Sequence, residues 1–218
     1  MFTEPRESLP GDGENAMSTN AARTFRINAE RASYFLDIHE GAQQGAGAPP
    51  TRFRELPRGA VVFAIGALDA YLSEVSAEVI VRDLQAALAS SEVREVLKRI
   101  HSDVPTLALE VAVLPQQIDR VERLRDAIVD YFQNRVSMHG SKGVSATAGR
   151  IGGRAADVWS ALGSRGHLRA QEDLDKWTTI RHQIVHQGMK PRVWRDHARD
   201  CIRLISAIVD VVDGFAAT

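Results

Sequence analysis

Apolar residues recur every three or four positions along most of this chain, a period that predicts α-helices rather than strands. The pattern predicts helices over 21–44, from about Pro57 onward, and over 82–101, 115–136, 154–163, 173–187 and 193–215. Glycine-rich or polar connections are expected at 45–50 and 137–153. No segment alternates as a strand does, and no internal repeat is visible, so we expect an all-α protein, an irregular helical bundle. Residues 1–20 are polar and are expected to be a disordered tail, with one domain over 21–218.

The helix that starts near Pro57 has two faces that can be buried. One face is apolar throughout and consists of Val61, Ile65, Leu68, Leu72, Val75 and Val79. The opposite face carries only small residues, namely Gly66, Ala70, Ser73 and Ala77. Small side chains let a neighbouring helix approach closely, so we expect this helix to be covered on both sides.

Composition fits an ordinary soluble globular protein, with 44% apolar and 25% charged residues. The formal net charge of −1 argues against a protein that coats nucleic acid through charge alone. Cys201 is the single cysteine, which excludes an internal disulfide framework. The N-terminus lacks the apolar segment of a secretory signal, and the longest apolar run, 59–68, is far shorter than the roughly 18 residues of a membrane span. We therefore expect a cytoplasmic protein without membrane association.

The segment TIRHQIVHQG (179–188) raises the clearest chemical question. It reads as the end of a helix, because Gly188 and Pro191 are stop signals. The apolar stripe of that helix consists of Leu174, Trp177, Ile180, Ile184, Val185 and Gly188. Arg181 falls near the centre of this stripe, where an unpaired guanidinium is costly. Three partners are possible for this charge: an internal carboxylate, a group from another subunit, or a bound anion. Asp69 is the candidate for the internal carboxylate. His186 lies about 140° around the helix from Arg181, in the last turn, where the helix dipole favours a protonated imidazole.

The spacing between this arginine and histidine is not specific by itself. An Arg followed by a His after four to six residues occurs three times in the chain, and roughly two such matches are expected by chance. Only the copy at 181–186 has the form W-x-x-I-R-H-x-I-V-H-x-G at the closing turn of an amphipathic helix. In that form it resembles the motif of the HEPN superfamily. The stretch RGAVVFAIGALDAYLSEV (58–75) is similar to the first core helix of the RiboL-PSP-HEPN subgroup, through its acidic-small-aromatic step Asp69-Ala70-Tyr71. The resemblance covers about 55–215.

The resemblance implies an all-α, HEPN-like domain that pairs two-fold, with the Arg–His segments of the two copies facing each other. Many such proteins are metal-independent endoribonucleases of toxin–antitoxin, phage-defence and RNA-processing systems, whereas others bind nucleotides or serve as dimer scaffolds. Carried over to this chain, Arg181 and His186 are the catalytic pair. His182 stands where Asn is frequent, and we assign it a supporting role together with Asp69. Gly188 stands where some members have a Tyr, so no tyrosine-dependent chemistry is expected.

The chemistry of RNA cleavage is compatible with these residue types. RNA carries its own nucleophile, the 2′-hydroxyl, so the protein needs a proton-transfer group of near-neutral pKa and a fixed cation for the developing charge. Histidine and arginine suit these two tasks, and two copies supply two of each. The expected function is a metal-independent endoribonuclease that acts as a homodimer on RNA without a cofactor and leaves a 2′,3′-cyclic phosphate. An antitoxin or effector protein is a further expected partner. The alternative is a non-catalytic dimerisation or nucleotide-binding module that acts with such a partner.

A structural zinc site is a competing interpretation of the histidines and the cysteine. His182 and His186 are one turn apart, and so are His197 and Cys201 on the next helix. The first two point away from the apolar stripe, while Cys201 lies within the apolar face of the last helix. A small core residue is therefore the favoured reading of Cys201, and no metal is expected.

The segment 142–170 carries five cations, Lys142, Arg150, Arg154, Arg165 and Arg169, against one acid, Asp157, a net charge of five minus one, or +4. Arg150 and Arg154 could bind the substrate phosphate from a loop, and a solvated connection fits the pattern equally well. The three tryptophans, Trp159, Trp177 and Trp194, lie among apolar neighbours and are expected to pack in the core.

Overall fold

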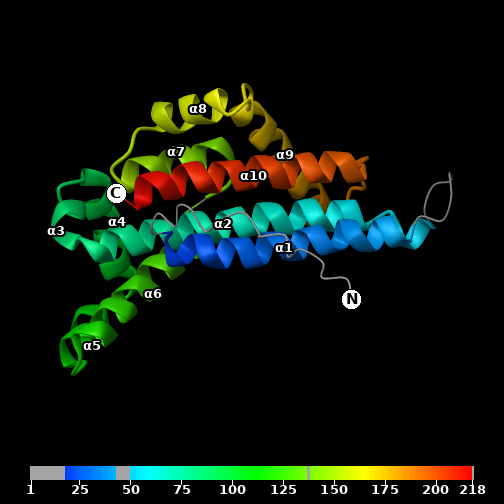
Figure 1. The fold of residues 1–218 in the computed structure, drawn as a ribbon. Helices are drawn as coiled ribbons and strands as arrows, with labels where there is room; N and C mark the ends of the chain where they lie inside the picture. The colour runs from blue at the N-terminus through cyan, green and yellow to red at the C-terminus, as the bar shows by residue number, and fades with distance from the viewer. Residues whose placement is uncertain (1–17, 43–49, 137, 218) are drawn as a thin grey trace, which may run out of the picture.

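The computed structural model describes residues 18–42, 50–136 and 138–217. Within these ranges the chain contains ten α-helices, a short 3-10 helix at Thr51–Phe53 and no strand, which confirms the predicted all-α class. The helices are α1 (Asn20–Gly41), α2 (Leu56–Arg82), α3 (Leu84–Ala87), α4 (Ser91–Asp103), α5 (Leu107–Val113), α6 (Gln117–Arg135), α7 (Gly140–Arg150), α8 (Ala155–Ser164), α9 (Ala170–Gln187) and α10 (Arg195–Ala216). Figure 1 shows α1, α2 and α10 running side by side, with α7, α8 and α9 along one flank and α5 projecting from the body.

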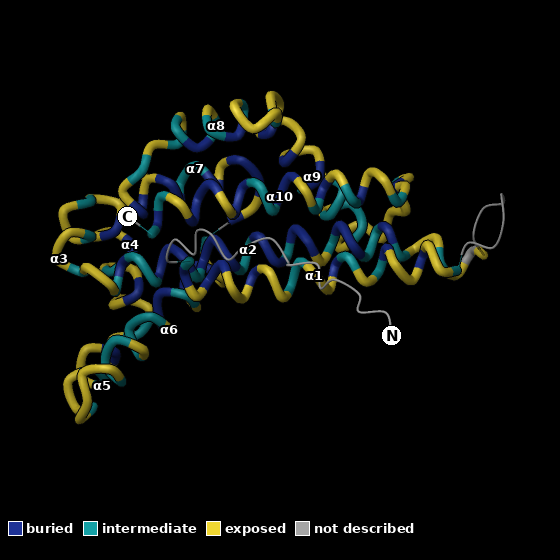
Figure 2. Tube along the Cα trace, viewed as in Figure 1, coloured by how far each residue is buried: buried dark blue, intermediate teal, exposed yellow. Residues whose placement is uncertain are grey.

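Helix α2 is the centre of the bundle, and α1, α6, α7, α9 and α10 all pack against it. Its predicted apolar face is buried from Val61 to Val75, and Ser73 and Ala77 on the opposite face are buried as well. Figure 2 shows that burial is concentrated along α2 and the inner side of α10. The predicted covering of α2 on both sides is therefore confirmed for most of its length. Gly66 and Ala70 are the exception, because they are only half-buried.

Helix α2 also has the length and composition of a membrane span, with a mean hydropathy of 1.5 over its most apolar window. The uninterrupted apolar run at 59–68 is shorter than this helix, because Asp69 and several small polar residues divide its apolar residues. However, 67% of that window is buried inside the bundle, as is usual for the core helix of a folded domain.

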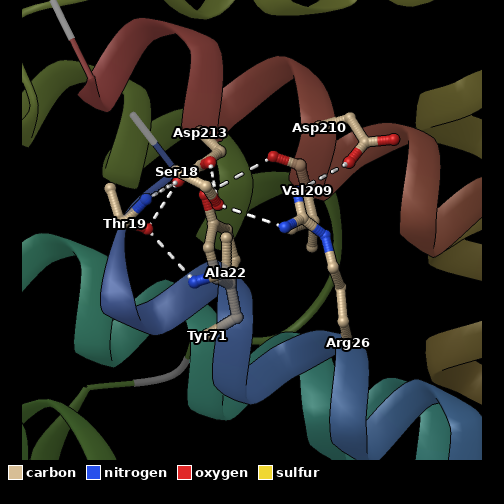
Figure 3. Close-up of polar contacts among 8 residues, drawn as sticks. All are labelled: Ser18, Thr19, Ala22, Arg26, Tyr71, Val209, Asp210 and Asp213. Atoms are coloured by element: carbon tan, nitrogen blue, oxygen red, sulfur yellow. Dashed lines mark hydrogen bonds and ion pairs between the residues drawn. The ribbon is translucent and has the colours of Figure 1, made fainter. Parts of the chain in front are cut away.

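The start of α1 is fixed by polar contacts with the ends of α2 and α10, and Figure 3 shows those with α10. The Thr19 hydroxyl caps the helix by accepting a hydrogen bond from Ala22 N at 3.1 Å, and it donates to the buried carboxylate of Asp213 on α10. Ser18 Oγ donates to the same carboxylate, and the Glu78 carboxylate of α2 accepts from the first two backbone N–H groups of α1. The prediction of a disordered tail is thus wrong for residues 18–20, while residues 1–17 lie outside the described part.

Two other predicted elements differ in the structure. The segment 82–101 was expected to form one helix, but the chain forms α3 and α4 instead, because Asp83 and Ser90 each cap a new helix with their side chains. Helix α5 was not predicted. The expected loop at 45–50 lies almost wholly outside the described residues, which resume at Pro50.

The prediction of a glycine-rich connection over 137–153 is wrong, since most of it is helix α7. Val144, Thr147 and Ala148 are fully buried and anchor α7 in the bundle. Gly140 enters the helix with φ of 67°, which favours glycine. A Cβ on Gly143 would lie 2.0 Å from the Met138 carbonyl oxygen. The glycines therefore permit a tight turn into a helix.

The tryptophans only partly follow the prediction of core packing. Trp177 is buried, and Trp159 is half-buried and donates a hydrogen bond from Nε1 to Ser145 Oγ at 3.1 Å. Trp194 is 52% exposed, with the Arg192 guanidinium 4.2 Å from the centre of its ring. The prediction is wrong for Trp194, because it is the N-cap of α10 and lies one position outside the packed helix.

Candidate functional site

The Arg–His segment ends α9 where the sequence predicts. Gly188 has φ of 62° at the C-cap, and Met189 N donates a hydrogen bond back to Gln183 O at 3.0 Å. Arg58, at the start of α2, then donates from Nε to Pro191 O at 2.7 Å. The end of α9 is therefore held against the start of the central helix.

Arg181 lies on the side of α9 that faces α2, and the predicted contact with Asp69 is present. Arg181 Nη1 is 4.0 Å from Asp69 Oδ2, and the two side chains are 21% and 16% exposed. At this separation the two groups attract each other without forming a close hydrogen-bonded pair. Asp69 therefore compensates the half-buried guanidinium only in part.

A third side chain, His139, meets the same carboxylate from the entry to α7. Its Nδ1 lies 2.7 Å from Asp69 Oδ2, and its side chain is 43% exposed. His139 is not predicted from the sequence, because no spacing or periodicity connects it with Asp69 on α2. It stands within the stretch 137–153, for which the sequence predicts a glycine-rich connection.

These three side chains line one pocket with a volume of about 270 Å³. Its wall is formed by residues of α2, α6 and α9 and of the entry to α7, namely Gly66, Asp69, Ala70, Ser73, Phe132, Gln133, Val136, Met138, His139 and Arg181. The small residues of α2 leave this space open, since a Cβ on Gly66 would meet no atom within 4 Å. The face of α2 that carries small residues is therefore covered at Ala77, whereas at Gly66 and Ala70 it lines the pocket.

The polar atoms of this pocket are not fully paired with protein groups. Among the described residues, both carboxylate oxygens of Asp69 and Nε of Arg181 are buried without a well-aligned hydrogen bond, even though His139 approaches Asp69 closely. Burial raises the pKa of Asp69, and the adjacent His139 and Arg181 oppose that rise. Buried polar groups normally find a partner, so this pocket suits a polar or charged ligand.

His186 and His182 lie elsewhere on α9. Both are exposed, and their ring centres are 4.9 Å apart. Neither lines the pocket that contains Arg181. A single copy of the chain therefore brings Arg181 together with Asp69 and His139, but not with His186.

The two arginines assigned to substrate binding lie outside the pocket. The Arg150 side chain is only 6% exposed and forms an ion pair with Glu92 at 2.9 Å. Its guanidinium also lies 4.8 Å from the centre of the Phe132 ring, so its charge is used in contacts within the protein. Arg154 is exposed and forms two hydrogen bonds with Asp157, at 2.8 and 2.7 Å. Contact of Arg154 with a phosphate stays a prediction, whereas Arg150 could reach one only if its side chain left Glu92 and Phe132.

The residues considered for zinc do not converge. Cys201 is fully buried in the apolar face of α10, and burial raises the pKa of its thiol, whereas His182 and His186 are exposed on α9. Within the described residues, no group of three or more His, Cys, Asp or Glu side chains could hold a metal ion. Cys201 is therefore a core residue, in agreement with the favoured reading.

Comparisons with protein-family models, with curated proteins and with solved structures give no match.

Proposed function

We propose that this chain is a metal-independent endoribonuclease in which Arg181 binds the scissile phosphate and His186 transfers a proton. The observation that carries the proposal is the state of Arg181, a half-buried guanidinium with an unpaired Nε and one carboxylate at 4.0 Å, at the wall of an open pocket. A half-buried cation without a close counter-ion favours a further anionic partner. A phosphate fits the planar fork of an arginine, and it is the group on which negative charge develops during RNA cleavage.

The position of His186 requires a second copy of the chain. His186 lies about 140° around α9 from Arg181, so it cannot reach the pocket of Arg181 in the same copy of the chain. Val185, next to His186 in the sequence, is an exposed apolar residue, and Met189 and Trp194 in the connection from α9 to α10 are exposed as well. Exposed apolar groups of this size favour a protein–protein contact, and a two-fold contact would bring His186 of one copy toward the pocket of the other. The resemblance to HEPN proteins supports the same pairing and suggests a role in a toxin or phage-defence system.

A second candidate function rests on the same pocket. A nucleotide phosphate could occupy the space beside Arg181 without being cleaved, and the separation of His186 from Arg181 within one copy favours that alternative. The chain would then be a dimerisation or nucleotide-binding module that acts with a partner effector.

The nuclease is tested with purified full-length protein and a structured RNA in excess chelator. We expect cleavage to persist, because the proposed chemistry uses only the 2′-hydroxyl, imidazole and guanidinium. The products should end in 2′,3′-cyclic phosphate, detected by mass spectrometry. Intact RNA from a folded dimer would contradict the nuclease and favour the binding module. Cleavage that chelator abolishes would contradict the metal-independent mechanism.

Filling the pocket should remove activity without removing the fold. In Gly66→Leu the new side chain extends from α2 into the open space beside Asp69 and Arg181. Displacing the phosphate by about 1 Å is expected to slow cleavage by roughly 100-fold. The melting temperature should not fall, since leucine favours a helix over glycine by up to about 1 kcal/mol. Gly66→Ala is the matched control and should cleave normally, whereas full activity in Gly66→Leu would place the site elsewhere.

A further inference from the structure

The entry to α7 contributes an imidazole to the pocket of Arg181, and that imidazole has no place in the Arg–His motif. We propose that His139 is a further catalytic residue, which accepts the proton of the attacking 2′-hydroxyl. This inference rests on the proposed nuclease function and adds a second proton-transfer group from the same copy that supplies Arg181. The proposed site then takes Arg181, Asp69 and His139 from one copy and His186 from the other.

The backbone next to His139 is held against α9. Directly after it, Ser141 donates two hydrogen bonds to the carboxylate of Asp175, from N and from Oγ, both at 2.8 Å. Asp175 lies on α9, the helix that carries Arg181. A Cβ on Gly140 would lie 2.6 Å from Asp175 Oδ1, so the close approach depends on glycine. The imidazole and the guanidinium therefore stand on elements that are joined directly to each other.

Asp69 is placed to select the tautomer of the imidazole. Its Oδ2 lies 2.7 Å from Nδ1 of His139, which is within hydrogen-bonding distance. A carboxylate at Nδ1 favours the tautomer with its proton on that nitrogen, which leaves the lone pair on Nε2 to accept a proton. The side chain is 43% exposed and lines the pocket, so RNA can reach it.

A purely structural ion pair explains this arrangement less well. A structural carboxylate usually has its oxygens paired with hydrogen-bond donors, as even the exposed Asp175 does with Ser141 N and Oγ. Asp69 instead has two buried oxygens without a well-aligned donor, and it faces an imidazole and a guanidinium across an open pocket. A carboxylate that orients two different groups toward one space is typical of a site rather than of a core.

The 2′-oxygen attacks phosphorus and forms a new P–O bond, while its proton passes to Nε2 of His139. The P–O5′ bond breaks, and the departing 5′-oxygen takes a proton from His186 of the second copy. Arg181 neutralises the charge on the non-bridging oxygens throughout. The products are a 2′,3′-cyclic phosphate and a 5′-hydroxyl, and no oxidant, reductant or metal is consumed.

The test compares two RNA substrates, one normal and one with sulfur in place of the bridging 5′-oxygen. Sulfur leaves without protonation, so this substrate restores a variant that lacks the general acid but not one that lacks the base. We expect His139→Ala and His139→Gln to slow single-turnover cleavage of both substrates by about 100-fold or more. His186→Ala should be slow on normal RNA and regain most of its rate on the sulfur substrate. His101→Ala, an exposed histidine on α4, is the control and should match the wild type.

Measurements of RNA binding and of melting temperature distinguish a catalytic role of His139 from a structural one. The His139 variants should bind an RNA with a 2′-deoxy scissile position as tightly as the wild type, and should melt at the same temperature. Wild-type rates in both His139 variants, while Arg181→Ala is inactive, would overturn the role of His139 and leave the nuclease intact. Rescue of His139→Ala by sulfur would make His139 the acid and overturn its role as base. A wild-type protein that cleaves no RNA would refute both proposals together.

Discussion

Replacing Arg181 by alanine is expected to reduce RNA cleavage by about 10²- to 10³-fold or more, the usual cost of losing a group that stabilises charge in the transition state. The guanidinium lines the pocket and is paired only at 4.0 Å with Asp69, so its charge remains available to the phosphate. The loss should appear in single-turnover rates at saturating enzyme, because the charge on the phosphorus oxygens is greatest in the transition state.

Two control variants show whether the slower cleavage comes from the missing guanidinium or from a change in the fold. Arg181→Lys keeps the charge but loses the planar fork, and we expect an intermediate rate. Arg203→Ala removes an exposed arginine of α10 that pairs with Asp200, and it should have no effect on the rate. Both Arg181 variants should retain the helical circular dichroism of the wild type. Wild-type cleavage by Arg181→Ala would exclude the pocket as the site of catalysis.

Replacing Gly143 by alanine is expected to destabilise the protein by about 3 kcal/mol, in the upper range for inserting a group into a packed site. The added Cβ would lie 2.0 Å from the carbonyl oxygen and 2.4 Å from the carbonyl carbon of Met138, and both atoms belong to the backbone. The turn that precedes α7 must then open. Because Met138 and His139 line the pocket, the same change should also reduce RNA cleavage.

The matched control for this variant lies on the same helix. Gly149→Ala would meet only a side-chain oxygen of Glu92, at 3.9 Å, and its φ is in the ordinary range. We expect it to be neutral or slightly stabilising, since alanine favours a helix over glycine. Urea unfolding curves of the two variants and the wild type measure the difference. Equal stability of all three proteins would mean that the turn at Met138 has room to adjust.

Local signals predicted much of the fold. Helical periodicity gave the central helix and the last two helices, and the pair Gly188 and Pro191 marked the end of α9. The contact between Arg181 and Asp69 followed from a physical argument, because a charge within an apolar stripe requires a partner. The segment at α7 was misjudged, since glycines that permit close approach cannot be distinguished from glycines of a loop without knowing what they approach.

The parts of the site that could not be predicted depend on long-range packing. His139 meets Asp69 only because α7 packs against both α2 and α9, and no local pattern encodes that placement. Arg150 had the composition of a phosphate contact, yet it is covered by Glu92 and Phe132, which come from two other helices. An arginine in the sequence can suggest a contact with phosphate, but only its burial in the folded protein shows whether the guanidinium is free to make that contact.

Mixing two inactive variants tests whether one active site is built from two chains. Arg181→Ala and His186→Ala copies are co-expressed with different tags, and the mixed dimers are purified through both tags. In a mixed dimer, one site has Arg181 and His139 from the His186→Ala chain and His186 from the Arg181→Ala chain, so we expect about half the wild-type rate per dimer. Each variant alone should be inactive. Mixed dimers as inactive as either parent would contradict a site shared between copies, and with it the roles proposed for Arg181 and His186.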